Sequence, residues 1–340
     1  MKELLRMTQV DQHRIRLFDD NSPEILLLHL GLSYNICNFR CHYCYLPNWN
    51  NKIDPTLLYK LDKLCERLKR IKRPLYIVFA SDGEISVTPA LWPYFKKLLE
   101  LNDLRMVTIF TNLSQDLGKI LDTFPAEKMA IIATYHIHQF KNVEMQKMRF
   151  FRRVEKLKRE VASIVVSFVL SPDQLEHFEE FKDTTGKIGV LSYAYPLLSK
   201  HSGKVDLKLY NREELKRVEK ILALDDNPAK IINDFCFGMK VNGLRCAAGR
   251  DYIEVSPDGQ TYRCYAISEG SYGNLFDPHG PWVNLRPEVC PLGGCGCNWA
   301  VAFSDRVSRN YKRINSLYNF VEKDSYDAGY QSLEVVNYSR

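Results

Sequence analysis

The sequence lacks the segments that mark several large classes of protein. No apolar run approaches the ~18 residues that a membrane-spanning helix requires, and the N-terminal segment is polar and charged, without the apolar core of a signal peptide. Internal repeats, low-complexity tracts and the long basic tail of a dedicated nucleic-acid-binding protein are also missing. We therefore expect a cytoplasmic protein that has neither a membrane nor a nucleic acid as partner.

Length and charge are compatible with an ordinary globular chain. The 340 residues suit one large domain plus a smaller one, and a hydrophobic content of 45% is enough to bury a full core. The net charge of +6 is modest. Basic residues concentrate in segments 63–73 and 147–159, which we interpret as solvated helix faces, the alternative being a patch for an acidic partner.

Cysteine, in contrast, is plentiful. Ten cysteines without a secretion signal favour metal ligands in a reducing compartment over disulfides. Eight of them are clustered, and two stand apart at Cys65 and Cys236. The clustered positions are Cys37, Cys41, Cys44, Cys246, Cys264, Cys290, Cys295 and Cys297.

The first cluster has the spacing C-x3-C-x2-C, formed by Cys37, Cys41 and Cys44. Three thiolates this close can hold three irons of one cubane cluster, which leaves the fourth iron without a protein ligand. An open iron can bind a small molecule and pass an electron to it, so the triplet predicts chemistry. The alternative is zinc, which usually takes a fourth Cys or His nearby. His42 is close, but it lies between two of the ligands, where its ring and the thiolates would compete for space.

Strand-like and helical segments alternate through the first 200 residues. Apolar, strand-like segments occupy residues 24–32, 75–80, 106–111, 129–135, 163–170 and 188–195. Helical spacing of apolar residues marks 54–71, 90–100, 116–124, 141–160 and 175–184. This alternation predicts an α/β fold with parallel strands, and six units are too few for a closed eight-fold barrel. We expect a partial (β/α)6 TIM-like barrel, with the cysteine triplet at the carboxyl end of its first strand.

A Cys-rich region follows the barrel. Residues 252–255 and 261–265 flank the turn sequence Ser256-Pro257-Asp258-Gly259 and predict a β-hairpin. The expected organisation is an N-terminal extension, the barrel, a helical linker with a helix at about 211–224, a small Cys-rich hairpin domain, and a C-terminal helix at about 303–323 with a tail. The corresponding boundaries are 1–24, 25–205, 206–240, 241–300 and 301–340.

The cysteine triplet resembles the signature of the radical S-adenosylmethionine (radical SAM) enzymes. The resemblance implies a [4Fe–4S] cluster whose open iron binds S-adenosylmethionine. The hairpin, with Cys246, Gly259 and Cys264 in a C-x12-G-x4-C pattern, resembles the SPASM/twitch extension of these enzymes. Its five cysteines suffice for one auxiliary [4Fe–4S] cluster with one to spare, so the shorter twitch form is the better match.

The resemblance implies Cys246, Cys264, Cys295 and one of Cys290 or Cys297 as ligands of the auxiliary cluster. A zinc ribbon is the rival interpretation, because four thiolates around a hairpin also suit zinc.

The segment after the second strand, with Gly83 and Glu84, resembles the family's Gly-Gly-Glu-Pro motif, which binds the amino group of S-adenosylmethionine. Asp82 and Ile85 depart from that motif. A carboxylate or a backbone carbonyl here can accept hydrogen bonds from an ammonium group. Without the resemblance, an ordinary acidic turn would be the simpler explanation.

Thr111 and Asn112 end the third strand and resemble the family's Thr-Asn-Gly, with Leu113 in the place of glycine. They are candidates for contacts with the ribose or the methionine carboxylate, or else for capping a turn. Tyr43 precedes the last cysteine of the triplet, where the family places an aromatic residue beside the adenine.

His136 and His138 follow the fourth strand and could face the substrate or bind ribose at the barrel mouth. We assign His136 to cofactor binding, the alternative being a loop histidine paired with backbone. Ser167, on the fifth strand, is a further candidate for a ribose contact.

An arginine on the helix after the fourth strand often grips the cofactor carboxylate in this family. We assign Arg152 to this role, with Arg149 and Arg153 as alternatives and a solvent-facing surface as the simpler explanation. Cys236 is a candidate catalytic hydrogen-atom donor, although a buried thiol or a metal ligand would explain it as well.

The resemblance implies an enzyme that reductively cleaves S-adenosylmethionine to a 5′-deoxyadenosyl radical and abstracts hydrogen from a substrate carbon. We expect the substrate to be a ribosomally made peptide or protein that is crosslinked, epimerised or oxidised. The alternatives are a small molecule such as an aminosugar or a nucleotide in a natural-product pathway, and a non-catalytic zinc-binding protein. The expected reductant is flavodoxin or ferredoxin.

Overall fold

The fold was analysed in a computed structural model. It describes residues 26–31, 36–44, 55–80, 83–197, 209–222, 245–246, 248–264, 267, 270–277, 279–280 and 288–289. Within these residues, no helix is both long enough and apolar enough to cross a bilayer. The expected C-terminal helix at 303–323 and the expected N-terminal extension lie outside the described residues.

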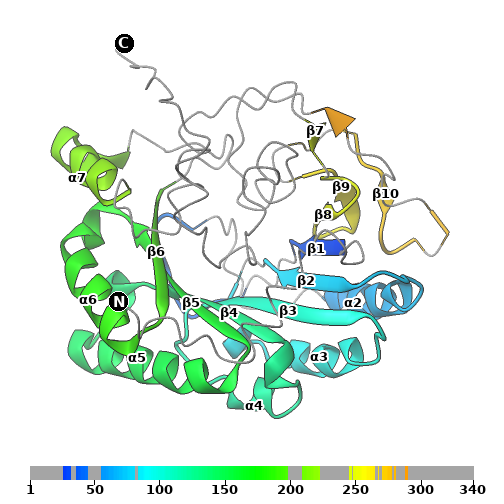
Figure 1. Ribbon diagram of the computed structural model, residues 1–340, viewed down its shortest axis with the longest axis horizontal. Coiled ribbons are helices and arrows are strands. Elements are labelled where there is room, and N and C mark those ends of the chain that lie inside the picture. Colours follow the sequence, from blue (N-terminus) through cyan, green and yellow to red (C-terminus); the bar gives the residue numbers. More distant parts are fainter. Residues whose placement is uncertain are drawn as a thin grey trace, which may run out of the picture.

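One sheet of nine strands organises the molecule, in the order β10-β9-β8-β1-β2-β3-β4-β5-β6 (Figure 1). Neighbouring strands from β1 to β6 are all parallel. These six are β1 (Leu26–Leu30), β2 (Leu75–Phe79), β3 (Leu104–Thr111), β4 (Met129–Tyr135), β5 (Ser163–Leu170) and β6 (Leu191–Pro196). The partial (β/α)6 barrel predicted from the sequence is therefore confirmed.

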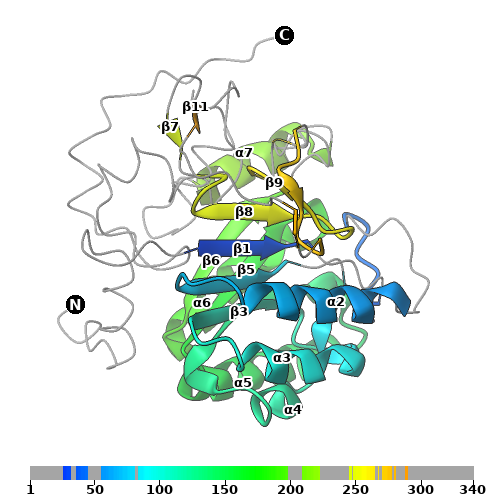
Figure 2. The same cartoon turned by 90° about the vertical axis from the view of Figure 1, so that its right-hand side faces the viewer.

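Helices connect consecutive strands and cover the outer face of the curved sheet (Figures 1 and 2). They are α2 (Pro55–Leu68), α3 (Trp92–Leu98), α4 (Gly118–Leu121), α5 (Val143–Glu160) and α6 (Phe178–Ile188), and α7 (Arg212–Leu222) follows β6. Short 3₁₀ helices lie in the connections, namely η2 (Ile85–Val87), η3 (Pro89–Leu91), η4 (Ala126–Lys128), η5 (Ile137–Gln139) and η6 (Pro172–His177).

Local sequence explains where these helices begin and end. α5 begins after Asn142, whose side chain accepts a hydrogen bond from the amide of Met145. α6 ends at Gly189, which has a φ of 67° in the left-handed region that favours glycine. The expected helix at 175–184 divides into η6 and α6, because Pro172 opens a tighter turn before the α-helix starts.

The main core lies between the sheet and the outer helices. α2 contributes one face of this core, with Leu57, Leu61, Leu64 and Leu68 buried at helical spacing. All residues of β2 are buried, as expected for a parallel strand covered on both faces. This packing fixes the strands, and the chain segments that follow them meet at one edge of the sheet.

The predicted hairpin is present, and it extends the barrel sheet. β8 (Tyr252–Val255) pairs antiparallel with β9 (Gln260–Tyr262). Gly259 occupies the turn with a φ of 86°, where a larger residue would be strained. β9 pairs with β10 (Gly273–Asn274).

β8 also pairs in parallel with β1, the first strand of the barrel. Opposite residues of these two strands interact: His29 Nδ1 lies 2.7 Å from Glu254 Oε2, and the Tyr252 hydroxyl donates to the same oxygen over 2.6 Å. The hairpin region is thus joined directly to the strand that precedes the cysteine triplet.

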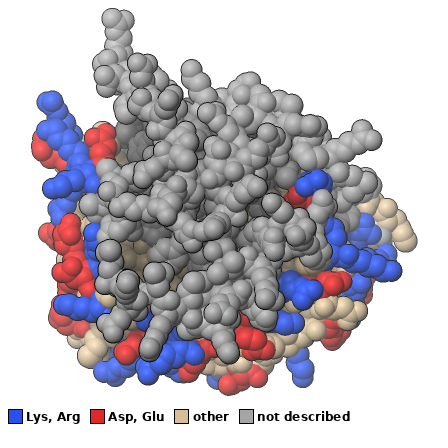
Figure 3. Space-filling view, in the orientation of Figure 1, with Lys and Arg blue, Asp and Glu red and all other residues tan. Residues whose placement is uncertain are grey.

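The charged surface supports the interpretation of the basic segments as helix faces. Lys and Arg side chains alternate with Asp and Glu over the outer helices in the visible face (Figure 3). On α5, Lys147 pairs with Glu144 and Glu180, and Lys156 pairs with Asp116. Exposed pairs of this kind contribute little stability.

Candidate functional site

The carboxyl ends of the parallel strands bring the candidate residues together. Cys37, Cys41 and Cys44 lie on the segment after β1, which we call the Cys loop (residues 36–44). The Cys44 amide donates to the Cys41 carbonyl over 3.0 Å, so the second and third cysteines sit on one turn. All three thiols are partly buried and form no disulfide.

The protein surroundings disfavour the ionised thiols. Burial raises the pKa of the Cys37 thiol to about 11, with the Phe39 amide opposing the shift. Burial and the two neighbouring thiols raise the pKa of Cys41 to about 12. Metal ligation requires thiolates, so a bound cation would have to supply the positive charge that stabilises them here.

Two hydrogen-bonding side chains approach the sulfurs from neighbouring strand ends. The Asn112 amide nitrogen lies 3.8 Å from Cys37 Sγ, and His136 Nδ1 lies 3.7 Å from Cys41 Sγ. Phe39 donates its backbone N–H to Cys37 Sγ over 3.4 Å. Hydrogen-bonding groups around thiolate ligands are typical of iron–sulfur sites. Three partly buried thiols on one loop, two of them beside such groups, fit a cluster with one open iron.

Glu84 connects three segments of the site. Its carboxylate accepts hydrogen bonds from the backbone N–H of Ser86 (2.9 Å), the Thr111 hydroxyl (2.6 Å) and the backbone N–H of Asn112 (2.5 Å). Its own amide donates to the Ile36 carbonyl over 2.7 Å. The side chain is only 2% exposed. Burial raises the pKa of this carboxyl group, and the donors from Asn112, Ser86 and Thr111 oppose that shift.

The residues that resemble the Thr-Asn-Gly motif lie at the end of β3. The side-chain amide nitrogen of Asn112 donates to Asn38 Oδ1 over 3.1 Å, which connects this strand end to the Cys loop. Leu113 has a φ of 48° and is buried. The guanidinium of Arg153 donates to the Leu113 carbonyl over 2.6 Å.

Tyr43 belongs to a second hydrogen-bond network. Its hydroxyl lies 2.8 Å from His136 Nδ1 and 3.4 Å from the amide nitrogen of Gln174. Gln174 Oε1 lies 3.1 Å from His138 Nδ1. Burial, with a smaller effect of His138, lowers the pKa of His136 to about 3, so its imidazole is neutral at physiological pH.

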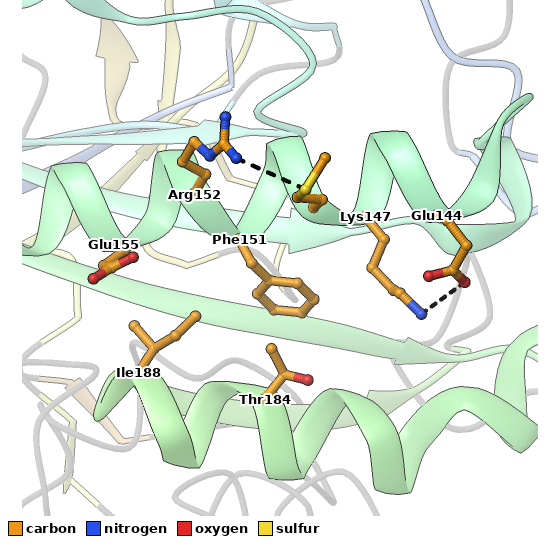
Figure 4. Close-up of a pocket in the computed structure, with 8 residues that line it drawn as sticks. Glu144, Lys147, Phe151, Arg152, Glu155, Thr184 and Ile188 are labelled. Atoms are coloured by element: carbon orange, nitrogen blue, oxygen red, sulfur yellow. Dashed lines mark hydrogen bonds and ion pairs between the residues drawn. The ribbon is translucent and has the colours of Figure 1, made fainter.

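Ser167 and Arg152 lie away from the Cys loop. Ser167 is buried within β5 and donates to the Thr134 hydroxyl over 3.0 Å, opposite Tyr193 in the sheet register. Arg152 is exposed and lines a groove of about 350 Å³ between α5 and α6, on the outer helical layer (Figure 4). Of the three candidate arginines, Arg153 is the one that contacts the strand-end edge, through Leu113.

The second cysteine cluster is described only in part. Cys264 is buried beyond β9, and its backbone bridges to Ile267. Cys246 ends β7 (Arg245–Cys246), which pairs antiparallel with β11 (Glu288–Val289). The predicted sites Cys236, Cys290, Cys295 and Cys297 lie outside the described residues.

Gln174 was missed by sequence reasoning. It is fully buried on η6, just after β5, and it contacts both Tyr43 and His138. The available signal was its position: the run Ser171-Pro172-Asp173-Gln174 follows a strand whose carboxyl end faces the same edge as the Cys loop.

The fold is similar to those of solved radical SAM enzymes. Native anSMEcpe with bound AdoMet superposes with a TM-score of 0.52 at 16% sequence identity, covering 74% of this chain and 78% of that one. The same protein with bound AdoMet and the Cp18Cys peptide gives a TM-score of 0.52 at 15% identity over the same shares. Streptococcus suis SuiB gives 0.48 at 14% identity, covering 74% of this chain and 63% of that one.

At these identities the likeness concerns the fold. No protein-family model matches the sequence, and no curated protein matches it either.

Proposed function

We propose that the chain is a radical SAM enzyme that holds a [4Fe–4S] cluster on Cys37, Cys41 and Cys44. One observation carries the proposal: three partly buried thiols lie on the segment after β1, and polar side chains from the ends of β3 and β4 approach two of them, Cys37 and Cys41. When bound, the cluster supplies an open iron for S-adenosylmethionine and the electron that cleaves its sulfonium to a 5′-deoxyadenosyl radical. Flavodoxin or ferredoxin is the reductant that we propose.

The chain's own residues position the cofactor. The Glu84 carboxylate is engaged by three protein donors, and the Glu84 carbonyl accepts from the Thr88 hydroxyl. We therefore assign the cofactor's ammonium group to the backbone carbonyl of Gly83, beside Glu84. The side-chain amide of Asn112 contacts the Cys37 sulfur, and the Thr111 hydroxyl donates to the Glu84 carboxylate. Arg153 replaces Arg152 as the arginine of the site, because it braces the end of β3.

Tyr43 and His136 form an aromatic pair beside the Cys loop. The two rings are stacked at 6.1 Å between centroids, and their hydrogen bond fixes the orientation of the tyrosine. We assign this pair to the adenine and ribose of the cofactor. Ser167 remains a candidate for a ribose contact, with its hydroxyl donating to the Thr134 hydroxyl.

The auxiliary [4Fe–4S] cluster remains part of the proposal, with Cys246, Cys264 and Cys295 as ligands. β11 ends at Val289, the residue before Cys290, and pairs with the strand that ends at Cys246. This pairing favours Cys290 over Cys297 as the fourth ligand. Cys236 remains a candidate hydrogen-atom donor.

A peptide or protein is the substrate that we favour. The peptide-bound anSMEcpe structure shares the fold, and this supports the choice. Deuterium tracing separates the two classes: the enzyme is incubated with a deuterated cellular peptide pool or with a deuterated small-molecule extract. Deuterated 5′-deoxyadenosine from the peptide pool alone supports the peptide substrate, whereas label from the extract alone contradicts it.

One observation favours zinc as the rival. Cys41, His136 and His138 each offer a ligand atom within 4.8 Å of the others, which suits a tetrahedral Zn²⁺ site. Iron, zinc and sulfide counts on anaerobically purified protein distinguish the two. A colourless, zinc-loaded protein without sulfide would overturn the radical SAM assignment.

The decisive functional test is formation of 5′-deoxyadenosine from S-adenosylmethionine and dithionite. We expect it from the native protein and not from the triple variant Cys37→Ala/Cys41→Ala/Cys44→Ala. Cys65→Ala is the matched control, because this thiol is buried in the α2 face of the core. Product formed by the triple variant would contradict the assignment of the ligands.

A further inference from the structure

A second set of metal-binding side chains lies beside the Cys loop and uses none of its thiols. His42 comes from the Cys loop, His138 from η5 after β4, and Asp173 from η6 after β5. Each offers one ligand atom within 4.8 Å of the other two. Two imidazoles and one carboxylate are a common donor set for a divalent transition metal.

The imidazole of His138 is held by its other nitrogen. Gln174 is fully buried, and its amide nitrogen donates to the Val169 carbonyl over 2.6 Å. This contact sets the orientation of the amide, so Gln174 Oε1 faces His138 Nδ1 at 3.1 Å. The proton of the neutral imidazole is therefore on Nδ1, and Nε2 carries a lone pair.

The lone pair on His138 Nε2 is available to bind a cation. His138 Nε2 is buried and has no hydrogen-bond partner among the described residues. A buried acceptor without a partner is unfavourable, and a cation bound at Nε2 would remove this cost. A histidine whose second nitrogen donates to a fixed oxygen is also the usual arrangement of a metal ligand.

The carboxylate is oriented in a similar way. Asp173 Oδ1 accepts a hydrogen bond from the Ser171 hydroxyl over 2.6 Å, and Oδ2 lies 3.8 Å from His42 Nδ1. Two ligands of a tetrahedral zinc ion are about 3.3 Å apart when each bond is ~2.0–2.1 Å. The side chains of His42 and Asp173 are 55% and 41% exposed, so small rotations would close this gap.

We propose that His42, His138 and Asp173 bind one divalent transition-metal ion, for which Zn²⁺ is the reference, next to the Cys loop. Three protein ligands leave a coordination position for water or for an oxygen group of a substrate. Because the ion needs none of the thiols, this site stands independently of the iron–sulfur assignment. His138 also belongs to the set with Cys41 and His136, so the test must separate the two sets.

The test counts metals in the full chain after anaerobic loading with iron and sulfide, which occupies Cys41. The protein is dialysed against micromolar Zn²⁺, and iron and zinc are measured in the same sample. We expect native protein to retain one more zinc per chain than His42→Ala or Asp173→Asn, with equal iron in all three. Both side chains are exposed, so these variants should fold.

His177→Ala is the matched control, since this histidine lies on the same short helix as Asp173 and outside the set. It should retain the zinc. Equal zinc in native protein, His42→Ala and Asp173→Asn would overturn the proposal. The iron counts report separately on the cluster, so failure of one assignment is not confused with failure of the other.

X-ray absorption at the zinc edge of the same samples identifies the ligands. The proposal requires only nitrogen and oxygen neighbours at about 2.0–2.2 Å. A zinc–sulfur distance near 2.3 Å would assign the ion to a cysteine set and would overturn the His42–His138–Asp173 site.

Discussion

The hydroxyl of Tyr43 lies 2.8 Å from Nδ1 of His136 and so joins the Cys loop to the end of β4. His136 is also the side chain whose ring nitrogen approaches Cys41 Sγ. Tyr43, which precedes Cys44, is thus linked through His136 to Cys41. This hydrogen bond fixes the position of the Tyr43 ring relative to the end of β4.

Tyr43→Phe tests that link. The variant keeps the ring and loses the contacts of the hydroxyl with His136 and Gln174. The shorter of these, to His136, is worth about 0.5–1.5 kcal/mol, or about a 2- to 12-fold change in affinity. We expect the dissociation constant for S-adenosylmethionine to rise within that range, with unchanged iron content, in anaerobic calorimetry. Tyr59→Phe, on an exposed side chain of α2, is the control. Loss of iron in Tyr43→Phe would mean that the link supports the cluster and not the cofactor.

Glu84→Gln tests the role of the carboxylate as a brace. The three partners of this carboxylate are all donors, so a side-chain amide would place an N–H group against at least one of them. We expect a loss of about 2–4 kcal/mol in the free energy of unfolding, measured by urea denaturation. Glu66→Gln, on the exposed side of α2, should change it by less than about 0.5 kcal/mol. A stability equal to that of native protein would refute the brace.

Leu113 combines strain with burial. Its φ of 48° costs a non-glycine residue about 1–2 kcal/mol, and its buried side chain is worth about 3–5 kcal/mol. We expect both Leu113→Gly and Leu113→Ala to be destabilising, with glycine the milder change by about 1 kcal/mol, because it alone relieves the strain. The urea denaturation midpoints of the two variants measure which one is more stable. An alanine variant more stable than the glycine variant would contradict the left-handed conformation.

Arg153 and Arg152 are adjacent on α5 and should behave differently. Arg153→Ala removes a charged hydrogen bond to the Leu113 carbonyl, which is worth about 1.5–3 kcal/mol. Arg152→Ala alters an exposed side chain in the outer groove. We expect Arg153→Ala to weaken cofactor affinity and stability more than Arg152→Ala does, as measured by calorimetry and urea unfolding. The reverse order would restore the assignment made from the sequence.

The difference between these arginines illustrates what the sequence could not provide. Arg149, Arg152 and Arg153 are close together on one helix, so their local sequence does not distinguish them. The packing of α5 against β5 and α6 decides which one turns inward. The same holds for Gln174, whose role depends on a contact with Tyr43 across 131 positions of the chain. Non-local pairings of this kind leave no periodic signal.

Local patterns predicted the strands well. β4 and β5 have the predicted bounds, because each is a largely apolar segment between polar ones. The turn at Gly259 was also predicted correctly, because turn formation depends on the residues of the turn itself. The pairing of β8 with β1 was not predicted: it joins residues more than 200 positions apart, and sequence patterns specify a strand without specifying its neighbour.

Electron paramagnetic resonance of the reduced protein tests the central claim most directly. The anaerobic protein, reduced with dithionite, should give the signal of a [4Fe–4S]⁺ centre, and added S-adenosylmethionine should shift its g values. Cys65→Ala should behave in the same way. A reduced centre whose spectrum is the same with and without S-adenosylmethionine would contradict the account, because the Cys loop would then offer the cofactor no open iron.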